Sequence, residues 1–197
     1  MRLLKRIVLA LVLAVVAVYT VGWLLPVAHV ASRSADFNTT PQRIYDAIAD
    51  VAGYPRWWSE ITGVEMLPAA DGRVRFRQHT SNGPIAMEVV EMIPPHKFVT
   101  RIADPDQPFG GTWTFEVTPQ NGRTRLTITE RGEVYDPLFR FMSRFVFGHT
   151  GTMESFLAAL EKEAGRVGRV GQVGRVGQVG GYAAESRKRV TDAQGYG

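Results

Sequence analysis

The sequence predicts an α+β domain in which one curved antiparallel sheet of seven strands surrounds a long C-terminal helix. Two short helices follow the first strand, and one transmembrane helix precedes the domain. The observations behind this prediction are an uncharged run near the N-terminus, a series of segments with two-residue periodicity, and a closing segment with helical periodicity. The links between the strands are too short for parallel crossovers, which need a dozen residues or more. We therefore expect an anchor at 1–31, a domain at 32–164 and a tail at 165–197.

The anchor contains 22 consecutive uncharged residues at 7–28. A helix of that length would measure about 33 Å, enough for a bilayer core of about 30 Å. A cleaved signal peptide is the alternative, but its apolar region is usually shorter, and the best cleavage sites here lack a small residue three positions before the cut. Because Arg2, Lys5 and Arg6 precede the run, we expect a single-pass membrane protein with a cytoplasmic N-terminus and an extracytoplasmic domain.

The net charge of +4 belongs to the ends of the chain. Residues 1–33 carry four basic and no acidic side chains, and residues 165–197 carry six basic and two acidic ones. The middle, 34–164, holds 13 basic and 17 acidic side chains, a net charge of −4. A mildly acidic domain without aromatics on a basic stripe predicts no nucleic-acid partner.

The tail at 165–197 begins with five consecutive Gly-x-Val triplets. It contains no proline, so it cannot form a collagen helix, and glycine at every third position makes an α-helix costly. We predict a flexible tail that is a repeat expansion without a function. Contact of its arginines with anionic lipid or nucleic acid is the alternative.

The domain opens with a strand at 29–38, followed by a helix that Thr40 caps and that has Pro41 at its first position. Gly53 ends this helix, and the sequence YPRWWSEI forms a second short helix or turn. Six strands with turn sequences such as Asn-Gly and Asp-Gly between them come next. They cover residues 64–67, 73–79, 85–93, 98–103, 112–118 and 125–134.

A long helix closes the domain. Asp136 caps it, Pro137 is its first residue, and apolar residues at helical spacing continue to about Ala164. This helix is the one element large enough to cover the dry face of the sheet. Since a curved sheet and a straight helix do not fit closely, we expect a space between them.

Three stretches carry a resemblance to a known superfamily: PQRIYDAIADVAGYPRWWSEI, GTWTFEVTPQNGRTRLTITERGEV and DPLFRFMSRFVFGHTGTMESFLAAL. With this order of elements, residues 32–164 resemble the SRPBCC or START-like helix-grip superfamily, in its polyketide cyclase/dehydrase-like branch. The resemblance implies a hydrophobic cavity for an apolar ligand between the sheet and the C-terminal helix. The superfamily ranges from lipid and sterol carriers to ring-closing enzymes, so the resemblance implies no single activity.

Glu130 is the most informative single residue. Alternation places Trp113 and Phe115 on one face of the sheet, and the parity that turns Ile128 inward turns Glu130 inward too. A carboxylate on an apolar face can hydrogen-bond a ligand hydroxyl or act as a general acid or base. The alternatives are that it lies at the open end of the strand or pairs with an arginine such as Arg101.

The remaining candidates for ligand contact are mostly aromatic. Trp58 and its neighbours Tyr54 and Trp57 lie between the short helices and the sheet, at the mouth of the cavity or in the core. Phe141 and Phe145 face the sheet by their helical spacing. The predicted ligand-binding set is Trp58, Phe76, Trp113, Phe115, Ile128, Glu130, Phe141, Phe145 and His149.

Nothing in the sequence predicts a metal or a cofactor. Cysteine is absent, the four histidines show no metal-ligand spacing, and there is no phosphate loop, dinucleotide fingerprint or nucleophile elbow. His149 lies between Gly148 and Gly151, where we expect a kink in the closing helix, and is a candidate for a polar ligand contact or an ordinary surface histidine. Arg73, Arg75 and Arg77 alternate along one strand, which predicts a solvated outer face or contact with lipid head groups.

These features predict membrane-tethered binding or transport of a lipid or another hydrophobic small molecule. We expect no second ionisable residue to point inward beside Glu130, which favours binding over acid–base catalysis. The first alternative is a polyketide cyclase/dehydratase-type enzyme with Glu130 as its acid or base. The second is an interaction module with a closed, ligand-free core.

Overall fold

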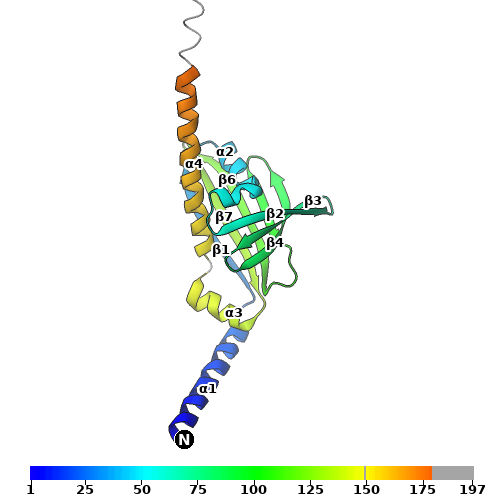
Figure 1. Cartoon of the computed structure of the whole chain (residues 1–197), viewed down its shortest axis with the longest axis vertical. Coiled ribbons are helices and arrows are strands. Elements are labelled where there is room, and N and C mark those ends of the chain that lie inside the picture. The colour runs from blue at the N-terminus through cyan, green and yellow to red at the C-terminus, as the bar shows by residue number, and fades with distance from the viewer. Residues whose placement is uncertain (149, 179–197) are drawn as a thin grey trace, which may run out of the picture.

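The computed structural model describes residues 1–148 and 150–178. One helix, α1 (Arg2–Leu24), precedes a single sheet of seven antiparallel strands in the order β1-β7-β6-β5-β4-β3-β2. Figure 1 shows α1 pointing away from one end of the sheet, while α4 runs along the sheet itself. The strands are β1 (Ala28–Phe37), β2 (Ile61–Ala70), β3 (Arg73–Thr80), β4 (Gly83–Ile93), β5 (Lys97–Ile102), β6 (Phe109–Gln120) and β7 (Arg123–Val134).

Two hairpin turns have the geometry that their sequences predict. Asp71 and Gly72 join β2 to β3, and Asn121 and Gly122 join β6 to β7, with φ angles of 51°, 73°, 49° and 77°. Two successive residues with positive φ match the right-handed twist of the strands they connect. These turns fix the register of β6 on β7 and of β2 on β3.

The short helices α2 (Pro41–Ala49) and η1 (Val51–Arg56) follow β1, as predicted. The Thr40 hydroxyl accepts a hydrogen bond from the Arg43 backbone N–H and caps α2. Asp136 caps α3 (Pro137–Met142) in the same way, because its carboxylate accepts from the N–H groups of Leu138 and Phe139. Both caps satisfy backbone donors that a helix leaves free at its start.

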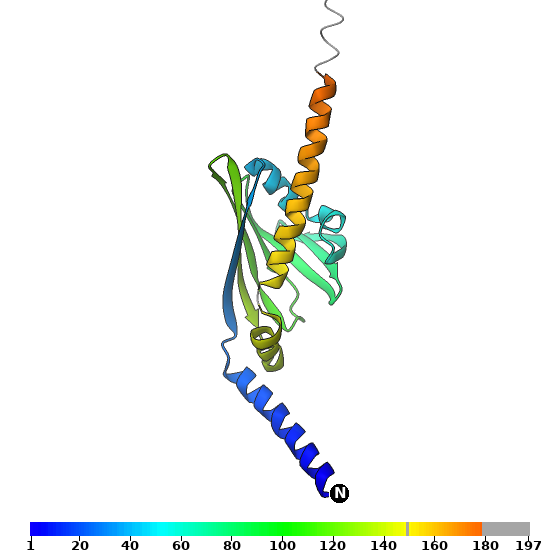
Figure 2. The same ribbon diagram turned by 90° about the vertical axis from the view of Figure 1, so that its left-hand side faces the viewer.

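The long closing helix predicted from Pro137 to Ala164, with a kink between Gly148 and Gly151, is divided into separate helices at that point. After α3 the chain forms one turn of π-helix, η2 (Ser143–Phe147), and α4 (Gly151–Gln178) begins after Gly148. The φ angle of Gly148 is 73°, a conformation that suits glycine and ends a right-handed helix. The closing segment is therefore bent at this point, with α3 under one end of the sheet and α4 along its face (Figure 2).

Both terminal predictions differ from the structure in their bounds. The helix predicted at 7–28 begins at Arg2 and ends at Leu24, because Pro26 cannot continue it and the residue before a proline favours an extended backbone. At the other end, α4 continues through the first triplets of the predicted flexible tail to Gln178. Extending an existing helix costs less than starting one, so glycine at every third position does not stop it at once. The rest of the predicted tail, 179–197, lies outside the described residues.

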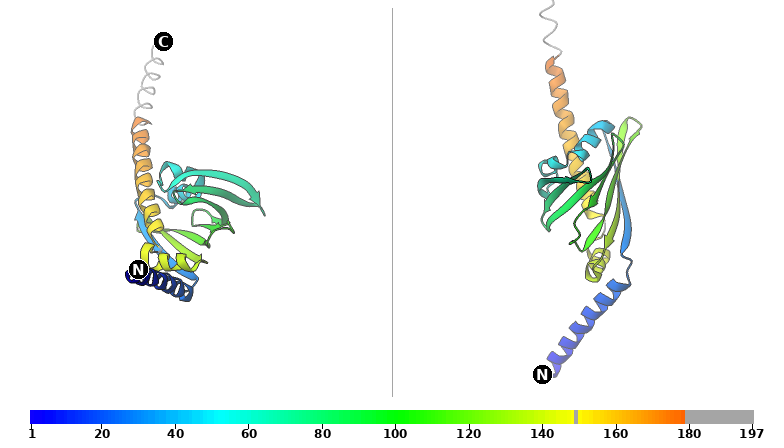
Figure 3. Two further views of the ribbon diagram at one scale, coloured as in Figure 1. Left: turned by 60° about the horizontal axis from the view of Figure 1, so that its bottom comes forward. Right: turned by 90° about the vertical axis from the view of Figure 1, so that its right-hand side faces the viewer.

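The core lies between α4 and the side of the sheet that we call the concave face, which curves around the helix (Figures 2 and 3). Phe156 of α4 is fully buried at its centre. It makes edge or tilted ring contacts with Tyr54, Trp57, Trp58, Trp113 and Phe115.

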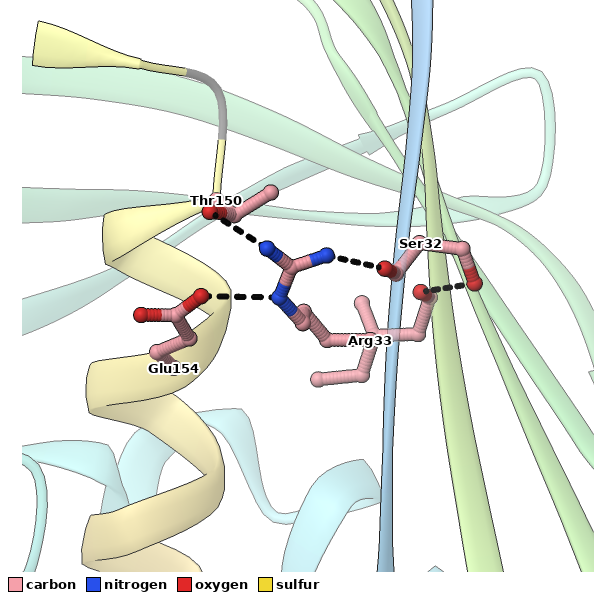
Figure 4. Close-up of polar contacts among 5 residues, drawn as sticks. Ser32, Arg33, Thr150 and Glu154 are labelled. Carbon is pink, nitrogen blue, oxygen red and sulfur yellow. Dashed lines mark hydrogen bonds and ion pairs between the residues drawn. The ribbon is translucent and has the colours of Figure 1, made fainter.

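Arg33 ties the start of α4 to the edge strand β1 (Figure 4). Its Nε donates to Glu154 Oε1 at 2.7 Å, and its Nη2 donates to Thr150 Oγ1 at 3.1 Å. Hydrogen bonds from the Arg33 and Thr150 side chains to the Glu154 carboxylate hold its pKa below the ordinary value. Arg33 thus joins the edge strand β1 to the first turn of α4.

Candidate ligand site on the concave face

The two ends of the concave face differ in burial. Under α4, Phe76, Phe115 and Ile128 are 1%, 2% and 0% exposed, so these predicted ligand contacts are packed in the core. Towards α3, Ile102 and Trp113 keep intermediate exposure. Apolar surface that a ligand could cover therefore lies at this second end, which we call the α3 end.

A polar pair occupies the α3 end. Glu130 of β7 lies opposite Trp113 of β6, and the indole Nε1–H donates to Glu130 Oε2 at 3.0 Å. The other carboxylate oxygen, Oε1, lies 3.3 Å from Nε2 of His29 on β1. The side chains of His29 and Glu130 are 18% and 23% exposed. We refer to His29, Trp113 and Glu130 as the polar cluster.

Gly132 makes room for this cluster. It lies opposite His29 in the β1–β7 register. A Cβ at this position would overlap the His29 ring and come within 2.9 Å of Glu130 Oε1. The absence of a side chain at 132 therefore lets the imidazole lie across the strand and reach the carboxylate.

The sequence prediction missed His29. We expected no second ionisable residue inward beside Glu130, and this expectation is wrong, because pairing of β1 with β7 brings residues 29 and 130 together across about 100 positions of sequence. Alternation along β1 could have indicated the inward direction of His29. Phe37 is buried, Ala31 and Ala35 pack against the core, and His29 lies on the same face because it is separated from them by even numbers of residues. Its place at the end of the anchor concealed this pattern.

The alternative partner for Glu130, Arg101, lies on the outer face. Arg101 and Arg73 both donate to Glu88 Oε1, at 3.3 and 2.7 Å. The Glu88 side chain is almost fully buried between them, and the hydrogen bond from Arg73 and the nearby guanidinium charges hold its pKa below the ordinary value. Arg77 pairs with Glu65 on the neighbouring strand, so the arginines of β3 lie on the outer face, as predicted.

The other predicted contacts lie elsewhere. Trp58 is 4% exposed and donates its Nε1–H to Ser155 Oγ at 3.1 Å, so it belongs to the core. Phe141 is partly buried, but Phe145, whose ring lies 4.9 Å from it, is 60% exposed and does not line the concave face. His149 lies outside the described residues.

The chemistry available at the α3 end is that of a carboxyl–imidazole pair in a largely apolar setting. Such a pair can bind a hydroxyl or carbonyl group of a ligand, and it can donate or accept a proton. Within residues 1–148 and 150–178 there is no group of three or more His, Cys, Asp or Glu side chains that could hold a metal ion.

Comparison with protein families decides the family. The family described as "Polyketide cyclase / dehydrase and lipid transport" matches residues 28–165, which is most of the chain. The chain belongs to this family. The match begins at the first residue of β1, so the strand that carries His29 is part of the family domain. No curated protein matches the sequence.

Solved structures share the START-like fold of this family member. A START superfamily protein from Mycobacterium smegmatis has 18% identity and a TM-score of 0.56, covering 71% of this chain and 99% of that one. The Zhui aromatase/cyclase from Streptomyces sp. R1128 has 15% identity and a TM-score of 0.57, covering 71% and 94%. A protein from Thermus thermophilus has 19% identity and a TM-score of 0.58, covering 71% and 99%. At these identities the likeness concerns the fold.

Proposed function

We propose that this protein binds a hydrophobic small molecule, such as a lipid, at the α3 end of the concave face while α1 tethers it to a membrane. The observation that carries the proposal is the polar cluster in a region of partly exposed apolar side chains. Apolar walls would supply affinity, and Glu130 and His29 would orient one polar group of the ligand. Covering about 250 Å² of apolar surface would contribute about 6 kcal/mol.

The tether is supported by the surface of α1. Among the described residues, Arg2–Leu24 is the one helix that is long and apolar enough to cross a bilayer. Its apolar side chains are exposed around the whole helix, which is costly in water and favourable in lipid. We propose the orientation predicted from Arg2, Lys5 and Arg6, with a cytoplasmic N-terminus and the domain on the other side.

Photo-crosslinking tests where the ligand binds. The full-length protein is incorporated into phospholipid vesicles containing a diazirine-labelled fatty alcohol, irradiated and digested, and the modified peptides are identified by mass spectrometry. We expect crosslinks on the inward residues of β5–β7 near Trp113. Ile102→Trp, which fills the α3 end, should remove them. Thr112→Trp, which adds the same bulk on the outer face, should leave them intact; crosslinks confined to α1 in the wild type would contradict the proposal.

An enzymatic function is the second candidate, and the His29–Glu130 contact favours it. The pair could move a proton to or from a bound substrate, as a cyclase or dehydratase requires. To separate the candidates, the small molecules that copurify with the wild type and with Glu130→Gln are compared by mass spectrometry. A compound heavier by one water molecule in Glu130→Gln would indicate a dehydratase with Glu130 as its acid or base. The same compound in both proteins would indicate binding.

A further inference from the structure

The segment formed by α3 and η2 presents exposed apolar side chains at the end of the domain nearest α1. Phe139, Phe145 and Val146 are 49%, 60% and 58% exposed. The neighbouring residues Tyr135 and Trp23 are also exposed, at 51% and 72%. Exposed aromatics that gather beside the end of an apolar helix are typical of a membrane–water interface. We call Phe139, Phe145 and Val146 the apolar face of α3–η2.

This segment is fastened to α1. The guanidinium of Arg140, only 9% exposed, donates from Nη1 to the carbonyl oxygens of Leu25 at 2.8 Å and Trp23 at 3.4 Å. These carbonyls belong to the C-terminal end of α1, where a helix leaves acceptors free and favours positive charge. Arg140 is thus a cap for α1 supplied by the domain.

A close backbone contact lies beside this cap. Gly22 is the buried residue of α1, and a Cβ there would overlap the Pro137 carbonyl of α3. The glycine therefore lets α3 lie directly against the C-terminal end of α1, and both views of Figure 3 show the two helices side by side there. Together with the Arg140 cap, this contact fixes the position of α3 along the axis of α1.

That position lies close to the outer boundary of the bilayer. A hydrocarbon core of about 30 Å takes about 20 helical residues. A span that starts after Arg6 therefore ends near residue 26, just past Leu24, and the contact of Gly22 with Pro137 lies about four residues, or about 6 Å, inside that boundary. The apolar face of α3–η2 is held at the level of the lipid head groups and the first acyl carbons.

We infer that α3–η2 is a membrane-interface segment, locked to α1 by Arg140 and Gly22, which inserts its apolar face into the bilayer. This inference rests on the membrane tether in the proposed function. It adds that the domain has a fixed orientation and is not suspended on a flexible link. Because α3 follows β7 directly, the α3 end of the concave face then lies next to the bilayer, and an apolar ligand can enter it without crossing water.

Single-cysteine labelling tests the inference, since the chain has no cysteine of its own. Phe139→Cys and Val146→Cys probe the segment, and Val15→Cys probes the middle of α1. Met66→Cys on β2, as exposed as these positions at 52%, is the control on the far edge of the sheet. Each full-length variant carries an NBD fluorophore in vesicles of phosphatidylcholine and phosphatidylglycerol, and doxyl-labelled lipids act as quenchers of known depth.

We expect labels at 139 and 146 to be quenched by the shallow doxyl lipid, the label at 15 by the deep one, and the label at 66 by neither. Labels at 139 and 146 that behave like the one at 66, with 15 still quenched, would overturn the inference and leave the tether intact. An unquenched label at 15 would overturn the tether and the inference with it.

The Arg140 cap has its own test. In Arg140→Gln the shallow quenching at 146 should fall at least about twofold, while the deep quenching at 15 is unchanged, since the apolar surface of α1 is unaltered. Circular dichroism of the same variant shows whether the sheet is retained. Unchanged quenching at 146 would overturn the locking role of Arg140.

Discussion

Glu130 receives its neighbours from the two strands on either side of β7. Trp113 comes from β6 and His29 from β1, and each binds a different carboxylate oxygen. The cluster therefore depends on the register of both strand pairs. Alternation within β7 was enough to predict that Glu130 points inward, but its partner on β1 required knowledge of a long-range pairing that periodicity does not contain.

Replacing Glu130 tests its contact with the ligand. We expect Glu130→Gln to weaken binding of a diazirine-labelled fatty alcohol about tenfold, which corresponds to about 1.4 kcal/mol and to the loss of one charge-assisted hydrogen bond from the ligand hydroxyl to the carboxylate. Glu133→Gln, three residues along the same strand and facing outward, is the matched control and should bind normally. Equal affinity of both variants, measured from the concentration dependence of crosslinking, would exclude Glu130 from recognition.

Glu88 predicts a pH-dependent stability. Its pKa is lowered in the folded protein, first by the hydrogen bond from Arg73 and then by the charges of Arg101 and Arg73. Its stabilising contribution is therefore complete above the ordinary pKa of 4.5 and is lost as the pH falls through the lower folded value. We expect Glu88→Gln to have a lower Tm than the wild type at pH 7. This difference in Tm should become smaller as the pH falls below about 4.5.

The control for this titration is Glu65→Gln, which removes a more exposed ion pair with Arg77 on the same outer face. Because exposed pairs contribute little, its Tm at pH 7 should stay close to that of the wild type. If the Tm difference for Glu88→Gln stayed constant from pH 7 to pH 3, the ion pairs would not be its cause.

At the scale of elements, the closing segment shows where sequence patterns succeed and where they fail. The apolar positions of α4 were predicted correctly, and Met153, Phe156 and Leu160 are fully buried. The helical pattern also runs through Phe141 and Phe145, so periodicity alone predicted a continuous helix, whereas Gly148 and Gly151 predicted a kink where the structure has a full break. That break depends on glycine adopting a positive φ and on α3 packing against α1, and the latter is a tertiary contact.

Phe156 is the contact on which the packing of α4 depends most. We expect Phe156→Ala to reduce the free energy of unfolding by about 3–5 kcal/mol, because it removes a fully buried ring that contacts five aromatic side chains. Met66→Ala, at an exposed position on the edge strand β2, should change the free energy of unfolding by less than about 0.5 kcal/mol. Chemical denaturation of both full-length variants in detergent micelles compares them, and similar losses would show that α4 is not the main cover of the sheet.

At the scale of the whole molecule, net positive charge lies at the two ends of the sequence and net negative charge lies in the domain between them. The basic residues in the first turns of α1 are the basis of the proposed orientation, whereas the domain between 34 and 164 is mildly acidic. The sequence predicted the seven strands and their antiparallel pairing, because alternation, turn residues and helix caps are local signals, and it indicated the family through a resemblance of three stretches. It did not predict that the domain rests directly on the last turn of α1, since this depends on Gly22 and Arg140, which lie 118 positions apart.

The central claim is that the fold holds a hydrophobic small molecule at the α3 end of the concave face. Its most direct test is native mass spectrometry of the full-length protein, extracted from membranes in detergent and released in the spectrometer. We predict one bound small molecule per chain in the wild type and in Thr112→Trp, and its loss in Ile102→Trp. A wild-type chain with no added mass, even after incubation with a lipid extract, would contradict the claim.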